Sequence, residues 1–258
     1  NSPTNGYFLQ AQSGNTGGLT WAAASGGGGG VTSDSYYNTV GGTDAGTNLN
    51  GASGGTYSTH FGYEAGKDNE TGQGNTFIGS LAGSNTHSGT YLNTYVGYQA
   101  GMNNGNGHQN VGVGYGVLKS NEAWSNVAVG NGAGEDNTSG TMNVFLGRSA
   151  AMNNTTGSYN IAIGYESLKT NTTGSDSIAI GDEALKSQTS ANSNIGIGTD
   201  SLKFATTGGW NVAMGDSSGE DITTGNGNTI LGHKALFSAT TSHSCVVIGR
   251  NAGGDLTT

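Results

Sequence analysis

The 258-residue chain is poor in charge, in proline and in cysteine. Only 8 lysines and arginines stand against 17 aspartates and glutamates, and the net charge of −9 offers no basic surface to nucleic acid or to an anionic membrane. The single cysteine, Cys245, excludes an intrachain disulfide and a multi-cysteine metal site. One proline excludes collagen, and no apolar run approaches the roughly 20 residues that span a bilayer. We therefore predict no nucleic-acid partner and no membrane insertion by this segment.

Glycine is abundant instead, with 50 residues, and it recurs with a period. The pattern Asn-apolar-X-apolar-Gly occurs thirteen times, and we call its last residue the anchor glycine. The anchors are Gly42, Gly62, Gly79, Gly97, Gly114, Gly130, Gly147, Gly164, Gly181, Gly198, Gly215, Gly232 and Gly249. From Gly130 onward every interval is seventeen residues. Such a strict period predicts stacked, equivalent coils, and hence an all-β fold, a parallel β-solenoid (β-roll or β-helix) of about thirteen coils.

Positions counted from the anchor glycine each have their own chemistry. Position −3 is β-branched in all thirteen repeats, and position −1 is large and apolar in twelve. Because alternate residues of a strand share a face, these two positions are predicted to point inward. Position −2 between them is more apolar than a solvated face requires, which indicates a second buried surface against another chain. The small residues at position +3 and the Gly or Leu at position +4 predict a second inward strand in each coil.

Position −4 is asparagine in ten of the thirteen repeats. Stacked side-chain amides can hydrogen-bond from coil to coil along the axis, so we predict a structural ladder here. Its members are Asn75, Asn93, Asn110, Asn126, Asn143, Asn160, Asn194, Asn211 and Asn228. A coil of seventeen residues is thin and buries little area alone, which favours a homotrimer around the rod axis.

The period divides the chain into three parts. Residues 1–24 lack it and are predicted to form an N-terminal β module, and residues 25–37, with SGGGGG at 25–30, form a glycine-rich joint. Residues 38–258 form the solenoid repeat domain. A column of threonines reaches its next step at Thr257, so we expect the solenoid to continue beyond the C-terminus. The first residue is Asn1 rather than methionine, which indicates a fragment or a processed product.

Acidic residues provide the strongest candidate for chemistry. Glu166, Glu183 and Asp200 share position +2 in successive coils, and lysines follow three residues after each of them. We predict two ladders that screen one another on a solvated edge. A Ca²⁺ site and a glycosidase-type carboxyl pair are the alternatives. The five histidines show no metal-ligand spacing and are predicted to lie in solvated loops. We therefore predict no catalytic residues, no metal site, no cofactor and no enzymatic activity.

Aromatic residues are the candidate receptor contacts, because exposed rings stack on sugars or anchor protein contacts. The same side chains could equally pack against a neighbouring chain. The candidates are Tyr63, Tyr98, Tyr115 and Tyr165 at position +1, and Trp124 and Trp210 in turns.

Two families resemble this sequence. Repeats such as SYNIAIGYESLKTNTTG (158–174) resemble the head repeats of trimeric autotransporter adhesins, which coil into a left-handed parallel β-roll and trimerise. The layout in which TNGYFLQAQSGNTGGLTWAAA (4–24) precedes a glycine-rich joint and such repeats is similar to tail-fibre and other virion-fibre proteins of bacteriophages. The resemblance implies a trimeric fibre, on a virion surface or extracellular, that contacts other virion proteins and binds a bacterial surface glycan or protein receptor. A trimeric bacterial surface adhesin is the main alternative; a polysaccharide-cleaving tailspike and an ice-binding solenoid rank below it.

Overall fold

The structure is a computed structural model that describes residues 7–11, 19–23, 31–87 and 89–254. β1 (Tyr7–Ala11) and β2 (Leu19–Ala23) form an antiparallel pair. All other described strands belong to one 14-stranded sheet, which begins with β3 (Thr32–Ser33), inside the residues expected to form a joint. The only described helix is the short 3₁₀ turn η1 (Gly51–Ser53).

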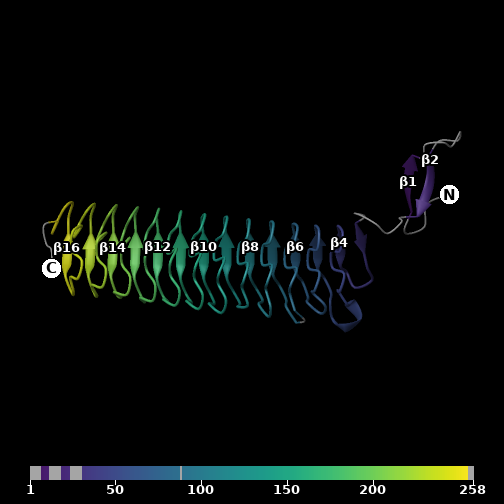
Figure 1. The fold of residues 1–258 in the computed structure, drawn as a ribbon, viewed down its shortest axis with the longest axis horizontal. Coiled ribbons are helices and arrows are strands. Elements are labelled where there is room, and N and C mark those ends of the chain that lie inside the picture. Colours follow the sequence, from purple (N-terminus) through teal and green to yellow (C-terminus); the bar gives the residue numbers. More distant parts are fainter. Residues whose placement is uncertain (1–6, 12–18, 24–30, 88, 255–258) are drawn as a thin grey trace.

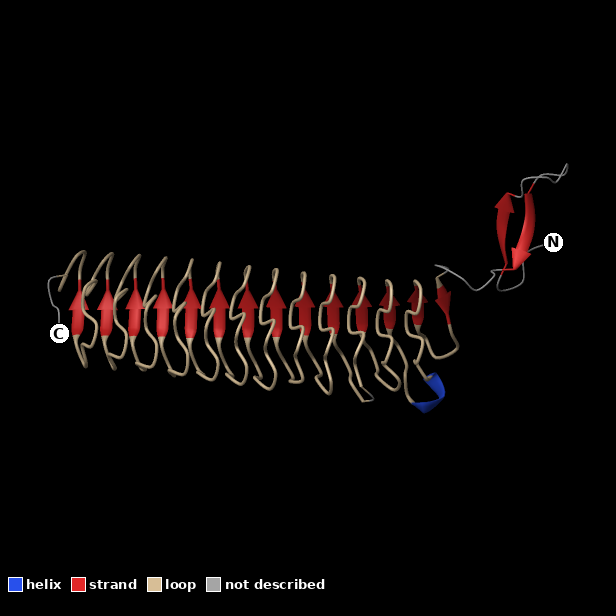
Figure 2. Ribbon diagram, viewed as in Figure 1, coloured by secondary structure: helices blue, strands red, loops and turns tan. Residues whose placement is uncertain are grey.

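Thirteen three-residue strands follow one another along the rod, each paired with the next in parallel (Figures 1 and 2). They are β4 (Thr39–Gly41), β5 (Thr59–Phe61), β6 (Thr76–Ile78), β7 (Thr94–Val96), β8 (Val111–Val113), β9 (Val127–Val129), β10 (Val144–Leu146), β11 (Ile161–Ile163), β12 (Ile178–Ile180), β13 (Ile195–Ile197), β14 (Val212–Met214), β15 (Thr229–Leu231) and β16 (Val246–Ile248). β3 pairs antiparallel with β4 and covers that edge of the sheet. The predicted all-β parallel solenoid is thus confirmed, with about twelve turns.

Successive coils are in register at every position. Ile161 pairs with Ile178 and Ile163 with Ile180, so that equal positions of the repeat lie side by side. The same register continues through the turns, where the amide of Glu166 donates to Arg148 O (3.0 Å) and that of Leu168 to Ala184 O (2.9 Å). Each repeat position therefore forms a column that runs along the rod.

Glycine is required at the anchor position for two reasons: its backbone conformation and the closeness of the next coil. Gly147 has φ of +139°, in a region that a Cβ atom disfavours. A Cβ atom at this residue would also collide with the carbonyl oxygen of Gly164, the anchor of the next coil. The column of glycines thus lets consecutive coils approach closely where the strand ends.

The predicted orientation of the strand is wrong. Position −2 points into the coil and is buried in twelve of the thirteen strands, Val40 being half-buried, whereas positions −3 and −1 point outward. In β11, for example, Ala162 is fully buried while Ile161 and Ile163 are partly exposed. The prediction that position −2 faces another chain is therefore also wrong, because these side chains lie inside their own coil. The columns at −3 and −1 form the outer surface of the sheet, which we call the strand face.

The predicted second strand is also absent from the described coils, each of which has one strand. Positions +3 and +4 are both buried, as Ser167 and Leu168 show, although consecutive residues of a strand would face opposite ways. This is possible because the residues on either side of Ser167 have left-handed backbone: Glu166 and Leu168 have φ of +52° and +53°. The buried residues thus come from a tight series of turns.

The narrow core is filled by matched large and small side chains. In some coils a ring at position −2 faces glycine at position +4: a Cβ atom on Gly83 would lie 2.8 Å from the ring of Phe77. In others a small residue at position −2, such as Ala179, accompanies leucine at position +4, here Leu185. Where both positions are small, as in Ala128 and Gly134, the next coil supplies the bulk, and a Cβ atom on Gly134 would lie 2.6 Å from the ring of Phe145. Large and small side chains are therefore matched within a coil or between neighbouring coils.

Candidate functional site

The strand face exposes apolar side chains along the outside of the described rod. Within the rod, Val127 and Val129 are 37% and 42% exposed, and in the last strand, which has one neighbour instead of two, Val246 and Ile248 are 72% and 65% exposed. Within the rod, the side chains of the strand face are therefore covered only by the side chains at the same positions of the two neighbouring strands. The two columns measure roughly 60 Å by roughly 13 Å, about 800 Å², from a strand spacing of ~4.8 Å and a two-residue width. Both columns are apolar in the seven consecutive strands β8–β14, over about 440 Å², whereas position −3 is threonine in β4–β7 and β15.

Position −5, two residues before the first column of the strand face, carries bulky exposed side chains in several coils. Met142, Tyr159 and Trp210 occupy it with φ between 56° and 58° and are 52%, 55% and 67% exposed. The chain places Gly74 and Gly227 at the same position, and glycine avoids the cost of left-handed backbone. Bulky residues are therefore not needed here to build the coil.

The asparagines at position −4 form a continuous buried ladder. Asn143 is typical: its Nδ2 donates to Asn126 Oδ1 (3.1 Å) and to Gly157 O (2.9 Å), and its Oδ1 accepts from the amide of Asn160 (2.9 Å). Among the nine asparagines predicted for this ladder, all are at most 1% exposed. Their role is structural, because these bonds lie inside the coil and face no solvent.

A second buried amide ladder, at position +7, was missed by the sequence analysis. Asn154 Nδ2 donates to Asn137 Oδ1 (2.7 Å) and Asn171 Nδ2 to Asn154 Oδ1 (2.7 Å). The recurrence of Asn seven residues after the anchors was the available signal.

The two ladders compensate for one another at one coil. Ser177 replaces asparagine at position −4, and the longer Gln188 replaces asparagine at position +7. Gln188 Nε2 donates to Ser177 Oγ (3.1 Å), and its Oε1 accepts from Asn194 Nδ2 (2.9 Å). The extra methylene of glutamine thus reaches the space that serine leaves empty.

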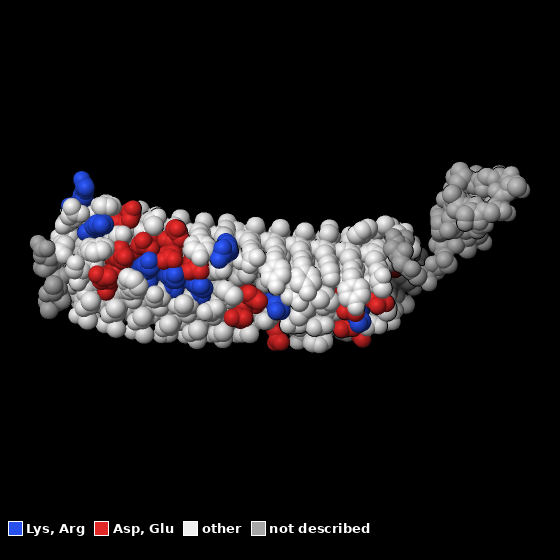
Figure 3. Space-filling model, turned by 45° about the horizontal axis from the view of Figure 1, so that its top comes forward, with Lys and Arg blue, Asp and Glu red and all other residues white. Residues whose placement is uncertain are grey.

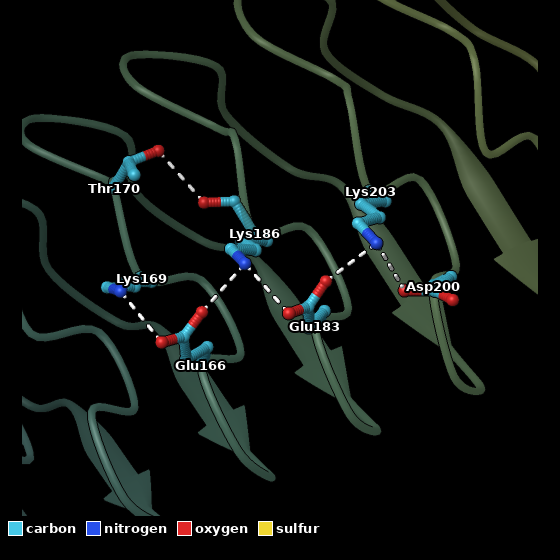
Figure 4. Close-up of polar contacts among 7 residues, drawn as sticks. All are labelled: Glu166, Lys169, Thr170, Glu183, Lys186, Asp200 and Lys203. Atoms are coloured by element: carbon cyan, nitrogen blue, oxygen red, sulfur yellow. Dashed lines mark hydrogen bonds and ion pairs between the residues drawn. The ribbon is translucent and has the colours of Figure 1, made fainter.

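The acidic and basic columns form one alternating chain of ion pairs (Figure 4). Lys186 Nζ lies 2.7 Å from Glu166 Oε2 and 2.7 Å from Glu183 Oε1, so it bridges two coils. Lys203 likewise bridges Glu183 (2.6 Å) and Asp200 (3.0 Å), and Lys169 holds the other oxygen of Glu166 (2.7 Å). On the face drawn in Figure 3, charged side chains gather over the C-terminal half of the rod, whereas much of the N-terminal half is uncharged.

These carboxylates are poorly suited to acid–base catalysis. Hydrogen bonds from Lys169 and Lys186 lower the pKa of Glu166 to about 2, and bonds from Lys186 and Lys203 lower the pKa of Glu183. A glycosidase needs one carboxyl whose pKa is raised so that it can donate a proton. The ladder therefore holds two ionised carboxylates that are already occupied by ammonium groups.

The candidate aromatic residues do not form one surface. Tyr63, Tyr98, Tyr115 and Tyr165 lie after the strand, at position +1, and are 38–51% exposed. Trp124 and Trp210 lie before the strand, at positions −6 and −5, and are 56% and 67% exposed. Tyr98 and Tyr115 contact one another with ring centroids 5.6 Å apart and planes tilted by 34°, and the Arg148 guanidinium lies 5.0 Å from the ring centroid of Tyr165.

One histidine contradicts the prediction of solvated loops. His60 occupies position −2 and is fully buried, stacked on Phe77 with centroids 5.0 Å apart. Its Nε2 lies 3.2 Å from Asn69 Nδ2, while its Nδ1 has no partner within the described residues. Burial lowers the pKa of His60 to about 4, so the ring is neutral at physiological pH. The matching glycine at position +4, Gly66, was the signal that this position is inward.

The threonine column at position +8 directs its hydroxyls inward along the rod. Thr155 Oγ1 donates to Thr172 O (2.8 Å), and Thr172 Oγ1 donates to Thr189 O (3.0 Å). These hydroxyl groups stabilise coil stacking, and their protons are not available to order water on a flat surface. The ice-binding alternative thus lacks support from this column.

The described residues contain no group of three or more His, Cys, Asp or Glu side chains placed to hold a metal ion. Over the same ranges, no helix has the length and hydropathy to cross a bilayer. The class that the fold defines is a parallel β-solenoid with an apolar strand face. Comparisons with protein families, with curated proteins and with solved structures found no match to this chain.

Proposed function

We propose that this chain is a rod segment of a homotrimeric attachment fibre, carried on a bacteriophage virion, which binds a bacterial surface receptor without cleaving it. The observation that carries the proposal is the strand face. Apolar patches on monomeric proteins are commonly about 300–600 Å², and a standard interface buries about 800 Å² per partner. The two columns together span about 800 Å², with a wholly apolar stretch of about 440 Å² over β8–β14, and their regular spacing suits association with a surface of the same repeat.

Further copies of the same chain are the partner that fits this face best. Its columns repeat at the strand spacing over the whole rod, and another copy presents apolar columns with the same spacing. Three copies around one axis bury all three strand faces together, which suits a coil whose own core is narrow. Three copies are proposed because the repeats resemble those of trimeric adhesins and virion fibres, and the virion location is proposed from the resemblance to virion fibres alone. A stiff rod of three chains then sets the reach of the receptor contacts and sums weak contacts by multivalency.

Light scattering tests the assembly. The expected native mass is three times the chain mass of 25.7 kDa, with β-rich circular dichroism. Ile180→Lys places a charge in the middle of the strand face and is expected to give folded monomers. Thr173→Lys, at an exposed position outside that face, is the matched control and should remain trimeric. A folded wild-type monomer or dimer would contradict the proposal.

Receptor binding needs a separate experiment. The trimer is mixed with lipopolysaccharide and capsule preparations from a panel of bacteria, and cosedimentation and released oligosaccharides are both measured. Cosedimentation without release is expected. Release of oligosaccharides would support a cleaving tailspike instead, and failure to cosediment with any preparation would contradict receptor binding by this region.

A further inference from the structure

The tyrosine column at position +1 is interrupted by a small residue. Tyr63, Ser80, Tyr98 and Tyr115 occupy this position in four successive coils. Backbone hydrogen bonds set their register: Leu81 N donates to Tyr63 O (2.8 Å), Gln99 N to Ser80 O (3.0 Å) and Gly116 N to Tyr98 O (3.0 Å). Two tyrosines thus stand two coils apart with only a serine side chain between them.

The dimensions of this gap suit a puckered ring. Two coils at a strand spacing of ~4.8 Å separate the tyrosines by roughly 9.6 Å. A flat ring stacked between two others needs only about 7–8 Å, because carbon atoms in contact lie about 3.5–4.0 Å apart. A pyranose ring is thicker, since its C–H groups stand above and below the mean plane. A backbone separation of roughly 9.6 Å thus leaves room for a puckered sugar ring between the two tyrosine side chains.

Both rings are exposed and leave the faces toward the gap uncovered by other rings. Tyr63 is 51% and Tyr98 46% exposed. On its other side Tyr98 packs against Tyr115 in a tilted arrangement, with centroids 5.6 Å apart and planes 34° apart, so neighbouring rings of this column contact one another along the rod. The small Ser80 side chain between them fills little of the gap.

Polar groups lie beside the gap. Lys67 Nζ lies 3.2 Å from Glu64 Oε1, and these side chains are 38% and 20% exposed. A hydrogen bond to Glu64 raises the pKa of the Tyr63 hydroxyl, so the carboxylate lies next to this ring. A carboxylate and an ammonium group at the edge of an aromatic face supply the acceptor and donors that sugar hydroxyls need.

The chain contains an internal comparison. Tyr165, Glu166 and Lys169 repeat the spacing of Tyr63, Glu64 and Lys67. There, however, the Arg148 guanidinium of the preceding coil lies over the tyrosine ring. The same three residue types are thus present without a gap between two tyrosine rings.

We propose that the gap at Ser80 is a saccharide-binding site, in which a pyranose ring of a surface glycan lies between Tyr63 and Tyr98 and hydrogen-bonds to the Glu64–Lys67 pair. This inference rests on the proposed attachment function and names the place of contact and the class of ligand.

Saturation-transfer NMR on the full chain tests the site. The probes are methyl α-glucoside, methyl α-galactoside, N-acetylglucosamine and rhamnose at millimolar concentration. At least one is expected to receive saturation on its ring C–H protons. Removing one stacking ring, in Tyr63→Ala or Tyr98→Ala, should weaken binding about 3- to 10-fold, the equivalent of one aromatic contact.

The decisive variant fills the gap. Ser80→Tyr should abolish saturation transfer while retaining the β-rich dichroism, because the column already accepts tyrosine in adjacent coils. Thr199→Tyr, at the same position in a coil without tyrosine neighbours, and Tyr165→Ala are matched controls that should leave binding unchanged.

No saturation transfer to any of the four probes, or transfer that survives Ser80→Tyr, would overturn the site. A trimer that cosediments with bacterial glycans but fails this test would leave the fibre proposal standing. A monomer that passes it would reject the fibre and keep the site.

Discussion

Replacing Asn143 tests how much the buried ladder stabilises the fold through its amide hydrogen bonds and how much through the volume that its side chains fill. In Asn143→Leu the side chain keeps its approximate size but loses its donations to Asn126 and Gly157 and its acceptance from Asn160. Gly157 O keeps a partner, because Asn154 Nδ2 also donates to it (2.9 Å), and Asn126 Oδ1 still accepts from the Asn143 amide (3.0 Å). The amide of Asn160 is then left buried without its partner.

The magnitude follows from this count. Three lost hydrogen bonds at about 1 kcal/mol each, with an added 1–3 kcal/mol for the orphaned amide, give a loss of about 4–6 kcal/mol in the free energy of unfolding. Asn143→Ser should cost only about 1–2 kcal/mol, because a serine hydroxyl can accept from the next amide. The chain already does this where Ser177 Oγ accepts from the amide of Asn194 (3.3 Å).

Denaturant unfolding followed by circular dichroism measures the difference, and hydrogen exchange at the Asn160 amide locates it. The leucine variant should show faster exchange at that amide, and the serine variant should remain close to wild type. Equal free energies for the two variants, within about 1 kcal/mol, would refute the assignment of the cost to the orphaned amide.

Three further outcomes are expected. Because the pKa of Glu166 is lowered to about 2, its ion pairs stabilise the fold above its ordinary pKa; the stability difference between wild type and Glu166→Gln should shrink from about pH 4.5 to pH 2 in a denaturation series, and should be unchanged from pH 6 to 8. Because burial lowers the pKa of His60 to about 4, wild type should lose up to about 3 kcal/mol as the pH falls from about 6.5 to 4, and His60→Phe should flatten that profile. In a double-mutant cycle, Ser177→Asn and Gln188→Asn should each destabilise, and together they should restore stability, with a coupling energy of about 1 kcal/mol or more; additive effects would contradict the compensation.

The period and the β-solenoid were predictable because they depend on spacing alone. Anchors repeated every seventeen residues require equivalent coils, and the asparagines at position −4 could be recognised as an inward column because no solvated face needs one residue type at each step. The bridging of Glu166 and Glu183 by Lys186 followed from parallel columns of opposite charge. Each of these features depends on a single position of the repeat, which can be read directly from the aligned sequence.

The orientation of the strand was not predicted, because the most apolar columns were assumed to be buried. The deciding signal lay in pairs of columns instead. In several coils the sizes compensate: Phe77 and Tyr95 at position −2 accompany glycine at +4, whereas Ala162 and Ala179 accompany leucine. Compensating sizes indicate a shared cavity, and in other coils, such as that of Ala128, the neighbouring coil fills the space instead. The second strand failed for a related reason: left-handed backbone at residues such as Leu168 places two consecutive side chains inside, which alternation rules do not include.

Amide side chains lie inside the coil and most isoleucine and valine side chains lie outside it, and this distribution links the stability of the rod to its assembly. The coil interior contains two columns of amides, and Asn143 and Asn154 show that their hydrogen bonds are met by neighbouring coils rather than by water. Most isoleucines and valines lie outside, on the strand face, where they stabilise one chain only through contacts along the ladder. Amide ladders, backbone bonds and a core of buried apolar side chains such as Phe145, Leu168 and Leu185 therefore hold the single chain together, while the strand face stays available for burial between chains. Because this core is complete within one chain, a charge on the strand face, as in Ile180→Lys, should prevent association without unfolding the coil.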